Sequence, residues 1–418
     1  MSNLKDKRLV LGVTGSIAAY KAAIIASQAT QAGADVRVVM TEAALRMVGA
    51  PTFAALTHNN VVSDMWEARA SAEIAHVTLG RTADVVLVAP LSANTLAKLA
   101  LGLADNELTA LCLSTRAPLV VAPAMETGMW EHPATQAHLA ALQARGVHAV
   151  VPGVGNLASG AQGLGRLADP GTVLEAVRLV LGQRGDLAGR RVIITAGGTR
   201  EPIDPVRYVS NHSSGKMGLA LAEAARDRGA HVTLIHTTEA SPPYGATEVR
   251  VASAAELREA VLDALPAVDA LIMAAAPADF TPARPADRKI KKSADNEGGL
   301  TLEMTRTSDI LRDVAAWRAE HANGRKIVVV GFAAETHDLL DNARAKLDAK
   351  RLDLIVANPV PQTFGSDLNQ ATLLDSAGGI YPLEPLPKAV LAERILDHVV
   401  ERLSQEEGNA EAQRRRGD

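Results

Sequence analysis

The chain contains little cysteine and few aromatic residues. Cys112 is the single cysteine among 418 residues, and Phe, Trp and Tyr together make up 3% of the sequence. One thiol excludes an intrachain disulfide and a cysteine-rich metal site. Because Cys112 lies in the apolar run Leu108–Leu113, we expect it to be an inert, buried thiol.

Long apolar runs and a strong excess of one charge are also missing. No apolar stretch approaches the roughly 20 residues that a membrane-spanning helix needs, and the first apolar run, Leu9–Val13, is too short for a secretory signal. The net charge of −4 gives no reason to expect nucleic acid or an anionic membrane as a partner. We therefore expect a soluble, cytoplasmic protein.

Short apolar strands alternate with amphipathic helices along most of the chain, which predicts parallel α/β sheets. A chain of 418 residues is too long for one ordinary core, and the polar, glycine-bearing segment 182–186 is a natural linker. We predict two doubly wound, Rossmann-like domains over residues 1–181 and 187–404. The charged tail, 405–418, is expected to be disordered, and the glycine turn between Ala371–Leu374 and Ile380–Tyr381 predicts a β-hairpin.

The most distinctive segment of the chain is Val209–Gly218, which combines small hydroxyl and amide side chains with two glycines and a lysine before an amphipathic helix. Just upstream, Gly197 and Gly198 close the predicted strand Val192–Thr195. Glycines let the backbone approach a ligand, and the N–H groups of a helix start favour an anion such as phosphate. This long polar loop is typical of a site for a nucleotide and a phosphorylated substrate.

The first half carries three turns that each directly follow a predicted strand, and the first two of them bear glycine or polar residues. They are Gly12–Lys21, Ala89–Lys98 and Pro123–Met125. A glycine pair at such a turn is as often only a tight turn, but Ala89–Lys98 holds more hydroxyl and amide groups than helix capping needs. Strand ends line the ligand crevice of an open parallel sheet, so we expect these turns to meet there.

These segments resemble a known family. Gly15–Lys21, Ala75–Val77, Ser92–Thr95 and Pro123–Met125 are similar to flavin-dependent decarboxylase domains that act on phosphopantothenoylcysteine, and the Asn211 loop is similar to the partner ligase domain. The chain thus resembles bifunctional phosphopantothenoylcysteine decarboxylase/phosphopantothenate–cysteine ligases of coenzyme A biosynthesis, from about Lys7 to Leu403. The resemblance implies a flavodoxin-like flavoprotein domain followed by a ligase domain.

For the first domain the resemblance implies FMN, which provides the electron sink that the substrate lacks by oxidising its thiol and later returning the electrons. It also implies His76 as the base and Arg81 as a substrate contact, although both could be ordinary surface residues. Glu126 and Ser159 stand where the family often has asparagine and a proton-donating cysteine. An anionic Glu126 would repel a substrate carboxylate unless it turns away or is protonated. The implied FMN contacts are Gly15, Ser16, Ile17, Thr41, Ser92, Ala93, Asn94, Thr95 and Ala124.

For the second domain the resemblance implies ligation of 4'-phosphopantothenate with cysteine, using CTP and Mg²⁺, through an acyl-cytidylate. Asn211 and Lys289 match catalytic positions, and Asp279 matches a nucleotide and magnesium position. Each has a plainer interpretation, namely a helix cap, a solvated basic loop and a turn residue. The other implied substrate contacts are Ser308, Asp309, Ile310, Leu311, Phe332, Lys346 and Lys350.

Two alternatives stay open. Glycine turns after strands also occur in nicotinamide-dependent oxidoreductases, but the Asn211 segment is longer than a dinucleotide turn and no Tyr-x-x-x-Lys pair follows it. The substitutions at Glu126 and Ser159 also leave room for a non-catalytic or regulatory flavin-binding first domain beside an active ligase. The resemblance further implies a homo-oligomer, with trimers of the flavin domain and dimers of the ligase domain.

Overall fold

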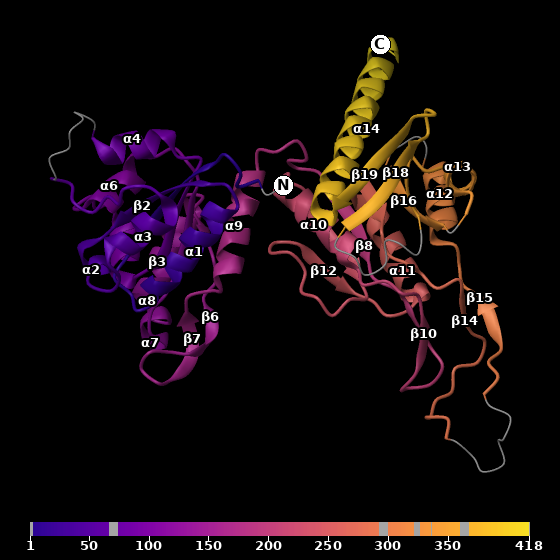
Figure 1. Cartoon of the computed structure of the whole chain (residues 1–418), viewed down its shortest axis with the longest axis horizontal. Coiled ribbons are helices and arrows are strands. Elements are labelled where there is room, and N and C mark those ends of the chain that lie inside the picture. The colour runs from indigo at the N-terminus through magenta and orange to yellow at the C-terminus, as the bar shows by residue number, and fades with distance from the viewer. Residues whose placement is uncertain are drawn as a thin grey trace. The chain divides into compact units, whose positions relative to one another are not determined.

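A computed structural model gives the structure of the chain (Figure 1) and describes residues 3–66, 74–291, 300–321, 327–335, 337–359 and 368–417. The chain forms two compact units, Ser2–Gln183 and Arg184–Asp418. Their boundary falls inside the polar segment 182–186. Each unit is described separately below.

The N-terminal unit is built on five parallel strands in the order β2-β1-β3-β4-β5. Their bounds are β1 (Arg8–Val13), β2 (Asp35–Met40), β3 (Val85–Leu91), β4 (Leu119–Pro123) and β5 (His148–Ala149). The central strands are continuous apolar runs and are almost wholly buried, as in sheets covered on both faces. The strand order changes direction between β1 and β3, which is the switch point of a flavodoxin-like sheet. The predicted doubly wound first domain is confirmed.

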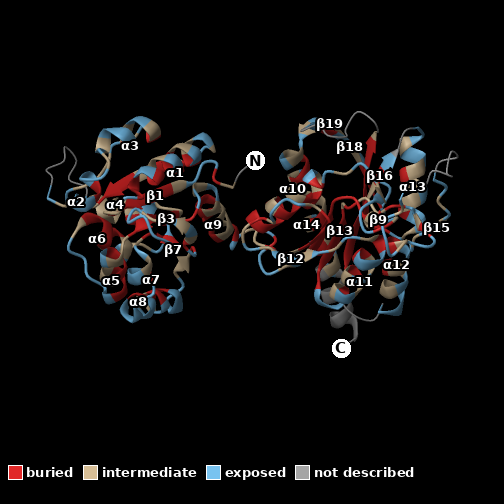
Figure 2. Cartoon of the chain, turned by 90° about the horizontal axis from the view of Figure 1, so that it is seen from below, coloured by how far each residue is buried: buried red, intermediate tan, exposed pale blue. Residues whose placement is uncertain are grey.

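Helices follow or precede these strands and present their outer faces to solvent, whereas the buried residues concentrate on the sheet (Figure 2). The helices are α1 (Ala19–Gln31), α2 (Glu42–Leu45), α3 (Ala50–Thr57), α4 (Ala75–Thr82), α5 (Ala93–Leu101), α6 (Glu107–Ser114), α7 (Thr127–Trp130), α8 (Pro133–Ala144) and α9 (Pro170–Gly182).

An antiparallel hairpin of β6 (Gly153–Asn156) and β7 (Gln162–Arg166) packs beyond the end of β4. The N–H group of Met125 donates to the carbonyl oxygen of Gly165 at 2.9 Å. Gly165 has a φ of +143°, and a Cβ there would overlap the carbonyl oxygen of Met125. Glycine is therefore what allows the hairpin to lie against this segment.

The C-terminal unit contains an eight-stranded sheet in the order β12-β11-β8-β13-β16-β17-β18-β19. The bounds are β8 (Arg191–Ala196), β11 (His231–His236), β12 (Thr247–Arg250), β13 (Ala270–Met273), β16 (Val328–Glu335), β17 (Leu354–Pro359), β18 (Leu368–Asp375) and β19 (Ile380–Pro387). The first six strands are parallel and follow the Rossmann order, with the switch point between β8 and β13. The last two add the predicted hairpin in antiparallel orientation.

Two separate two-stranded antiparallel sheets accompany the eight-stranded sheet in this unit. They are β9 (Arg200–Pro202) with β10 (Tyr208–Ser210), and β14 (Phe280–Pro282) with β15 (Met304–Arg306). The helices of the unit are α10 (Lys216–Asp227), α11 (Ala254–Ala264), the short 3-10 helix Leu265–Ala267, α12 (Ile310–Glu320), α13 (Leu339–Ala349) and α14 (Lys388–Gly417).

The C-terminal helix is long. Helix α14 continues to Gly417 and so includes residues 405–417 of the charged tail. Leu391, Ile395 and Val399 anchor the first half of the helix in the core. The following Glu, Ala, Gln and Arg residues are good helix formers, so the helix can propagate once its first turns are packed.

Candidate active sites

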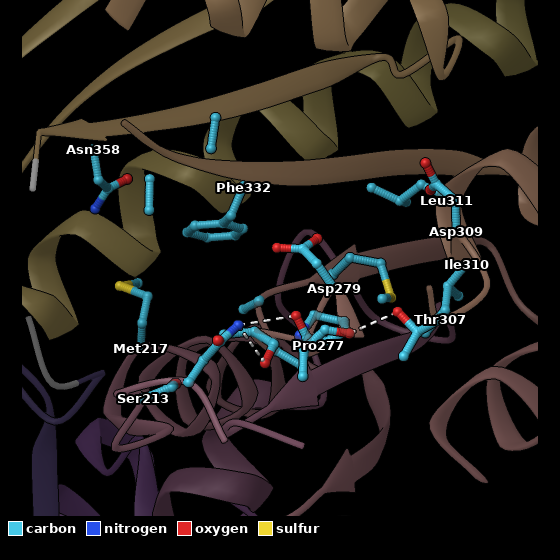
Figure 3. Close-up of a pocket in the computed structure, with 18 of the residues that line it drawn as sticks. Ser213, Met217, Pro277, Asp279, Thr307, Asp309, Ile310, Leu311, Phe332 and Asn358 are labelled. Atoms are coloured by element: carbon cyan, nitrogen blue, oxygen red, sulfur yellow. Dashed lines mark hydrogen bonds between the residues drawn. The ribbon is translucent and has the colours of Figure 1, made fainter. Parts of the chain in front are cut away.

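A pocket of about 850 Å³ lies at the switch point of the C-terminal unit. It is lined by the start of α10, the segment after β13, the start of α12 and the end of β16. Figure 3 shows Asp279 and Phe332 reaching toward each other within it. In an open α/β sheet this is the place where ligands bind.

Side-chain hydrogen bonds connect the loops that form the pocket. Asn211 donates through Nδ2 to the carbonyl oxygen of Pro277 at 2.9 Å, which joins the loop before α10 to the loop after β13. Thr307 donates through Oγ1 to the carbonyl oxygen of Ala278 at 2.6 Å, which joins that loop to the start of α12. The pocket is therefore held together across three segments that lie far apart in sequence.

The start of α10 suits an anionic group. Gly215 precedes the helix with a φ of +71°, and a Cβ there would overlap Thr238. No side chain caps this helix end and its first turn has no acidic residue. Since the first N–H groups of a helix have no partner inside the helix, they can donate to phosphate oxygens.

Cationic side chains and an aromatic ring complete the other side of the pocket. The Nζ atom of Lys350 lies 3.1 Å from the Asp309 carboxylate, and Asp309 also caps α12. Lys346 donates through Nζ to the carbonyl oxygen of Phe332 at 2.7 Å. Two ammonium groups one helical turn apart can neutralise polyphosphate oxygens, and a half-buried phenyl ring can stack on a base.

Most of the residues proposed for the ligase half line this one pocket. They are Asn211, Asp279, Ser308, Asp309, Ile310, Leu311, Phe332, Lys346 and Lys350. Lys289 is exposed and is not among the lining residues of the pocket. It belongs to the connection that leaves β14, and Lys292, the end of the same basic run, lies outside the described residues.

Two residues that the sequence patterns did not single out hold the Lys289 loop. The buried Asp204 accepts from the N–H of Ile290 at 3.1 Å, and Arg207 donates to the carbonyl oxygen of Ile290 at 2.9 Å. Arg207 also forms an ion pair with Asp204. Hydrogen bonds from Arg207 hold the pKa of Asp204 far below its usual range. Asp204 and Ile290 lie 86 residues apart, so no local sequence pattern indicated that they would meet.

In the N-terminal unit, Thr14 links the ends of β1 and β3. Its Oγ1 donates to the carbonyl oxygen of Pro90 at 2.7 Å and accepts from the N–H of Ser92 at 2.9 Å. Ser16 lies near the end of β4, with Oγ 3.4 Å from the carbonyl oxygen of Ala124. The three predicted strand-end turns therefore meet at the β1/β3 switch point.

The remaining residues proposed to contact a flavin surround this point. Thr41 caps α2, and its Oγ1 lies 3.5 Å from the carbonyl oxygen of Val13 at the end of β1. Ser92 caps α5 through the N–H of Thr95. Helix α1 has no side-chain cap and no acidic residue in its first turn, and Ile17 just before it is 63% exposed. Gly15, Ala93 and Asn94 occupy the same turns.

The two residues that depart from the family pattern contact each other. Ser159, in the turn of the β6–β7 hairpin, donates through Oγ to the Glu126 carboxylate at 3.0 Å. Glu126 follows the end of β4 directly. The carboxylate that would repel an anionic substrate is thus turned toward the hairpin and hydrogen-bonded there.

His76 lies elsewhere in this unit, at the start of α4. Its Nδ1 is 3.3 Å from the carboxylate of Glu107 at the start of α6. Arg81 follows in the last turn of α4. Figure 1 shows α4 and the β6–β7 hairpin at opposite ends of the unit, so a single chain does not bring His76 to Ser159.

Cys112 is partly rather than fully buried, and desolvation raises its pKa to about 12, which keeps the thiol protonated at neutral pH. Within the ranges that the structure describes, no group of three or more His, Cys, Asp or Glu side chains is arranged to hold a metal ion. No described helix is long and apolar enough to cross a bilayer.

Two doubly wound units, each with an uncapped helix start at its switch point, define a two-domain α/β protein with one expected ligand crevice in each domain. Comparison with known families makes this specific. The flavoprotein family matches residues 1–182, and the DNA/pantothenate metabolism flavoprotein C-terminal domain matches residues 187–403.

Similar proteins span nearly the whole chain. The coenzyme A biosynthesis bifunctional protein CoaBC of Mycobacterium tuberculosis strain H37Rv is 45% identical over 94% of this chain and 96% of its own length. The protein of the same name from Escherichia coli K12 is 41% identical over 96% of this chain and 98% of its own. A crystal structure of the C-terminal domain of a CoaBC protein is 36% identical over 53% of this chain and 99% of its own, with a TM-score of 0.45. The chain belongs to the family of bifunctional coenzyme A biosynthesis proteins.

Proposed function

We propose that the C-terminal unit joins 4'-phosphopantothenate to cysteine with CTP, and that the N-terminal unit decarboxylates phosphopantothenoylcysteine to 4'-phosphopantetheine with FMN. Family membership over both units supports the pairing of the two reactions. The single structural observation that carries the first reaction is the pocket at the β8/β13 switch point, where an uncapped helix start and two lysines surround one cavity.

Ligation proceeds in two displacements. A carboxylate oxygen of phosphopantothenate attacks the α-phosphorus of CTP and pyrophosphate leaves; the amine of cysteine then attacks the acyl carbon and CMP leaves. Lys346 and Lys350 offset the charge on the triphosphate, and Asn211 orients the acyl-cytidylate. We assign Lys289 a contact with the reacting phosphate when substrates are bound. Its loop is the one that Asp204 and Arg207 hold through hydrogen bonds to Ile290.

Magnesium fits the pocket as a companion of the triphosphate. Mg²⁺ is usually bound through one or two carboxylates together with substrate phosphates and water, so it does not need a dedicated protein cage. Asp279 and Asp309 both line the cavity, but Asp309 already pairs with Lys350 and caps α12, whereas Asp279 extends toward Phe332 (Figure 3). Asp279 is therefore the better carboxylate for this role. We propose that Asp279 binds the magnesium ion and contacts the nucleotide.

The N-terminal switch point has the donors that FMN requires. The uncapped start of α1 suits the phosphate, and the hydroxyl groups of Ser16, Thr41 and Ser92 surround it. Bound FMN would supply the oxidation of the substrate thiol that allows the neighbouring carboxylate to leave as carbon dioxide. His76 acts as the base, and Arg81 binds the substrate.

A homo-oligomer would complete the decarboxylase site. His76 and the Ser159–Glu126 pair lie at opposite ends of the unit, so one copy would provide the base and another the hairpin. The exposed side chains of Tyr20 and Ile24 share one face of α1, the exposed Ile17 lies just before the helix, and together they fit burial against a second copy. We propose trimers of the N-terminal unit, dimers of the C-terminal unit and a cytoplasmic location.

The two activities can be tested separately on the purified protein. It should carry an FMN-like absorption spectrum and release pyrophosphate from CTP only when phosphopantothenate is present. Added cysteine should then give phosphopantothenoylcysteine, and carbon dioxide should follow. Ligation without carbon dioxide release from supplied phosphopantothenoylcysteine would contradict the proposed decarboxylase. It would favour a regulatory flavin-binding unit, which the substitutions at Glu126 and Ser159 make a real alternative.

A further inference from the structure

The carboxylate of Glu107 is buried in a way that helix capping does not explain. Glu107 is the first residue of α6, and only 3% of its surface is exposed. Asn106 already caps this helix through the N–H of Thr109, and Thr109 closes a capping box in return. Because burying a charged carboxylate is costly, a second role is needed to account for its position.

The Glu107 carboxylate faces the imidazole ring of His76, a group that can donate a hydrogen bond to it. Its Oε2 lies 3.3 Å from Nδ1 of His76, whereas its Oε1 has no hydrogen-bond partner within the described part of the chain. A carboxylate only accepts hydrogen bonds, so Nδ1 of His76 is the donor. The proton is thereby kept on Nδ1, and the lone pair of a neutral ring is on Nε2.

The helices that carry the pair are fixed against each other. Ser114 donates through Oγ to the carbonyl oxygen of His76 at 3.3 Å, and Thr115 donates through Oγ1 to that of Gly80 at 2.8 Å. A Cβ on Gly80 would lie 3.0 Å from Oγ of Ser114. The backbone of α4 is thus set by α6 independently of Glu107, which leaves the carboxylate to orient the ring.

We propose that Glu107 is a positioning residue for the decarboxylation step: it fixes the tautomer and orientation of His76 so that Nε2 is the nitrogen that accepts the proton. This inference rests on the proposed role of His76 as the base. A partly exposed ring, with 23% of the side chain accessible, fits a nitrogen that must meet a substrate. A carboxylate that holds a catalytic imidazole in this manner acts through the histidine and does not touch the substrate.

The test measures carbon dioxide release from phosphopantothenoylcysteine by the full-length protein. Glu107→Leu removes the acceptor and should lower kcat by about 10- to 100-fold with little change in KM. Glu107→Gln keeps a carbonyl oxygen and should restore most of the rate. Asp105→Asn is the matched control, because Asp105 lies two residues earlier, is exposed and pairs with Lys98 at 2.6 Å. It should behave like the wild type.

A double-mutant cycle separates positioning from structural damage. If Glu107 acts through His76, Glu107→Leu should lower the rate no further in a His76→Asn background. The rate at which diethyl pyrocarbonate modifies His76, followed by mass spectrometry, should also fall in Glu107→Leu, because the ring loses its oriented, polarised form. A fully additive effect, or an unchanged rate in Glu107→Leu, would overturn the inference. If His76→Asn itself retained the wild-type rate, the proposed base would be wrong instead. The flavin absorption spectrum of the same variants reports whether the N-terminal unit, which carries both residues, remains folded.

Discussion

The two units place the expected ligand crevice at the same point of a parallel sheet but surround it with different side chains. In both, the crevice opens where the strand order changes direction, between β1 and β3 in the first unit and between β8 and β13 in the second. The first unit surrounds that point with hydroxyl groups and an exposed apolar side chain, whereas the second surrounds it with lysines and a half-buried phenyl ring. Backbone topology therefore sets where a ligand binds, and the side chains after each strand decide which ligand it is.

The units also differ in how much of a site one chain provides. The nine predicted ligase residues at the C-terminal pocket come together within one unit. In the N-terminal unit the predicted base and the Ser159–Glu126 pair lie at opposite ends. One chain therefore brings most of the proposed ligase residues into one pocket, but it does not bring His76 to the Ser159–Glu126 pair.

The largest expected effect is a reciprocal loss of the two activities. His76→Asn should reduce carbon dioxide release by about 10²- to 10⁴-fold, because a positioned acid–base group contributes that much, and should leave ligation unchanged. Lys289→Gln should abolish ligation and preserve the flavin spectrum. Assays of pyrophosphate and carbon dioxide release on both variants check this. Loss of both activities in either variant would contradict two separable sites.

The next largest effect is expected at Asp204, which together with Arg207 holds the loop that carries Lys289. Asp204→Asn should reduce ligation by about 10- to 100-fold, as loss of an orienting partner does elsewhere. The folded-state pKa of Asp204 is depressed, so its stabilising contribution is present above the unfolded pKa of about 3.9 and is lost as the pH falls through the folded value. Urea unfolding of wild type and variant should therefore differ at pH 7 and converge in strong acid. The exposed Asp287→Asn, on the same loop, serves as the control.

A smaller effect is expected when one glycine of each unit, Gly215 or Gly102, is replaced by alanine. Gly215 and Gly102 have φ values of +71° and +73°, but a Cβ would overlap Thr238 at the first position and meet open space at the second. Both alanine variants should lose about 1–2 kcal/mol from backbone strain. Gly215→Ala should lose more and should also weaken ligation. Equal losses of unfolding free energy, each measured against the wild type for the unit that carries the glycine, would show that the close approach at Gly215 is unimportant.

The smallest effect is expected at the hairpin. Ser159→Ala removes one exposed hydrogen bond to Glu126, which is worth about 0.5–1.5 kcal/mol. Carbon dioxide release should therefore change by no more than about tenfold, with ligation unaffected. Abolished decarboxylation would instead show that the Ser159 hydroxyl takes part in the chemistry, and the contrast between the two units would need revision.

The strand and helix order could be read from the sequence because each element has its own local period. Continuous apolar runs such as Val85–Ala89 mark strands, the turns at Gly15 and Ser92 mark strand ends, and Gly215 marks a helix start, whichever way the chain then folds. The resemblance to known motifs then indicated which side chains at those turns are expected to contact a ligand. Composition is a weaker guide near 405–417, because helix α14 is anchored upstream at Leu391 and Ile395 and its bounds include this segment.

Local sequence alone determined where the turns fall and which turns carry polar groups. Tertiary structure decided which of them meet. The contacts of Asp204 with Ile290, Glu107 with His76 and Glu126 with Ser159 join residues 86, 31 and 33 positions apart. No periodicity encodes such pairs, because they arise only when the sheet order places distant strand ends and helix starts side by side.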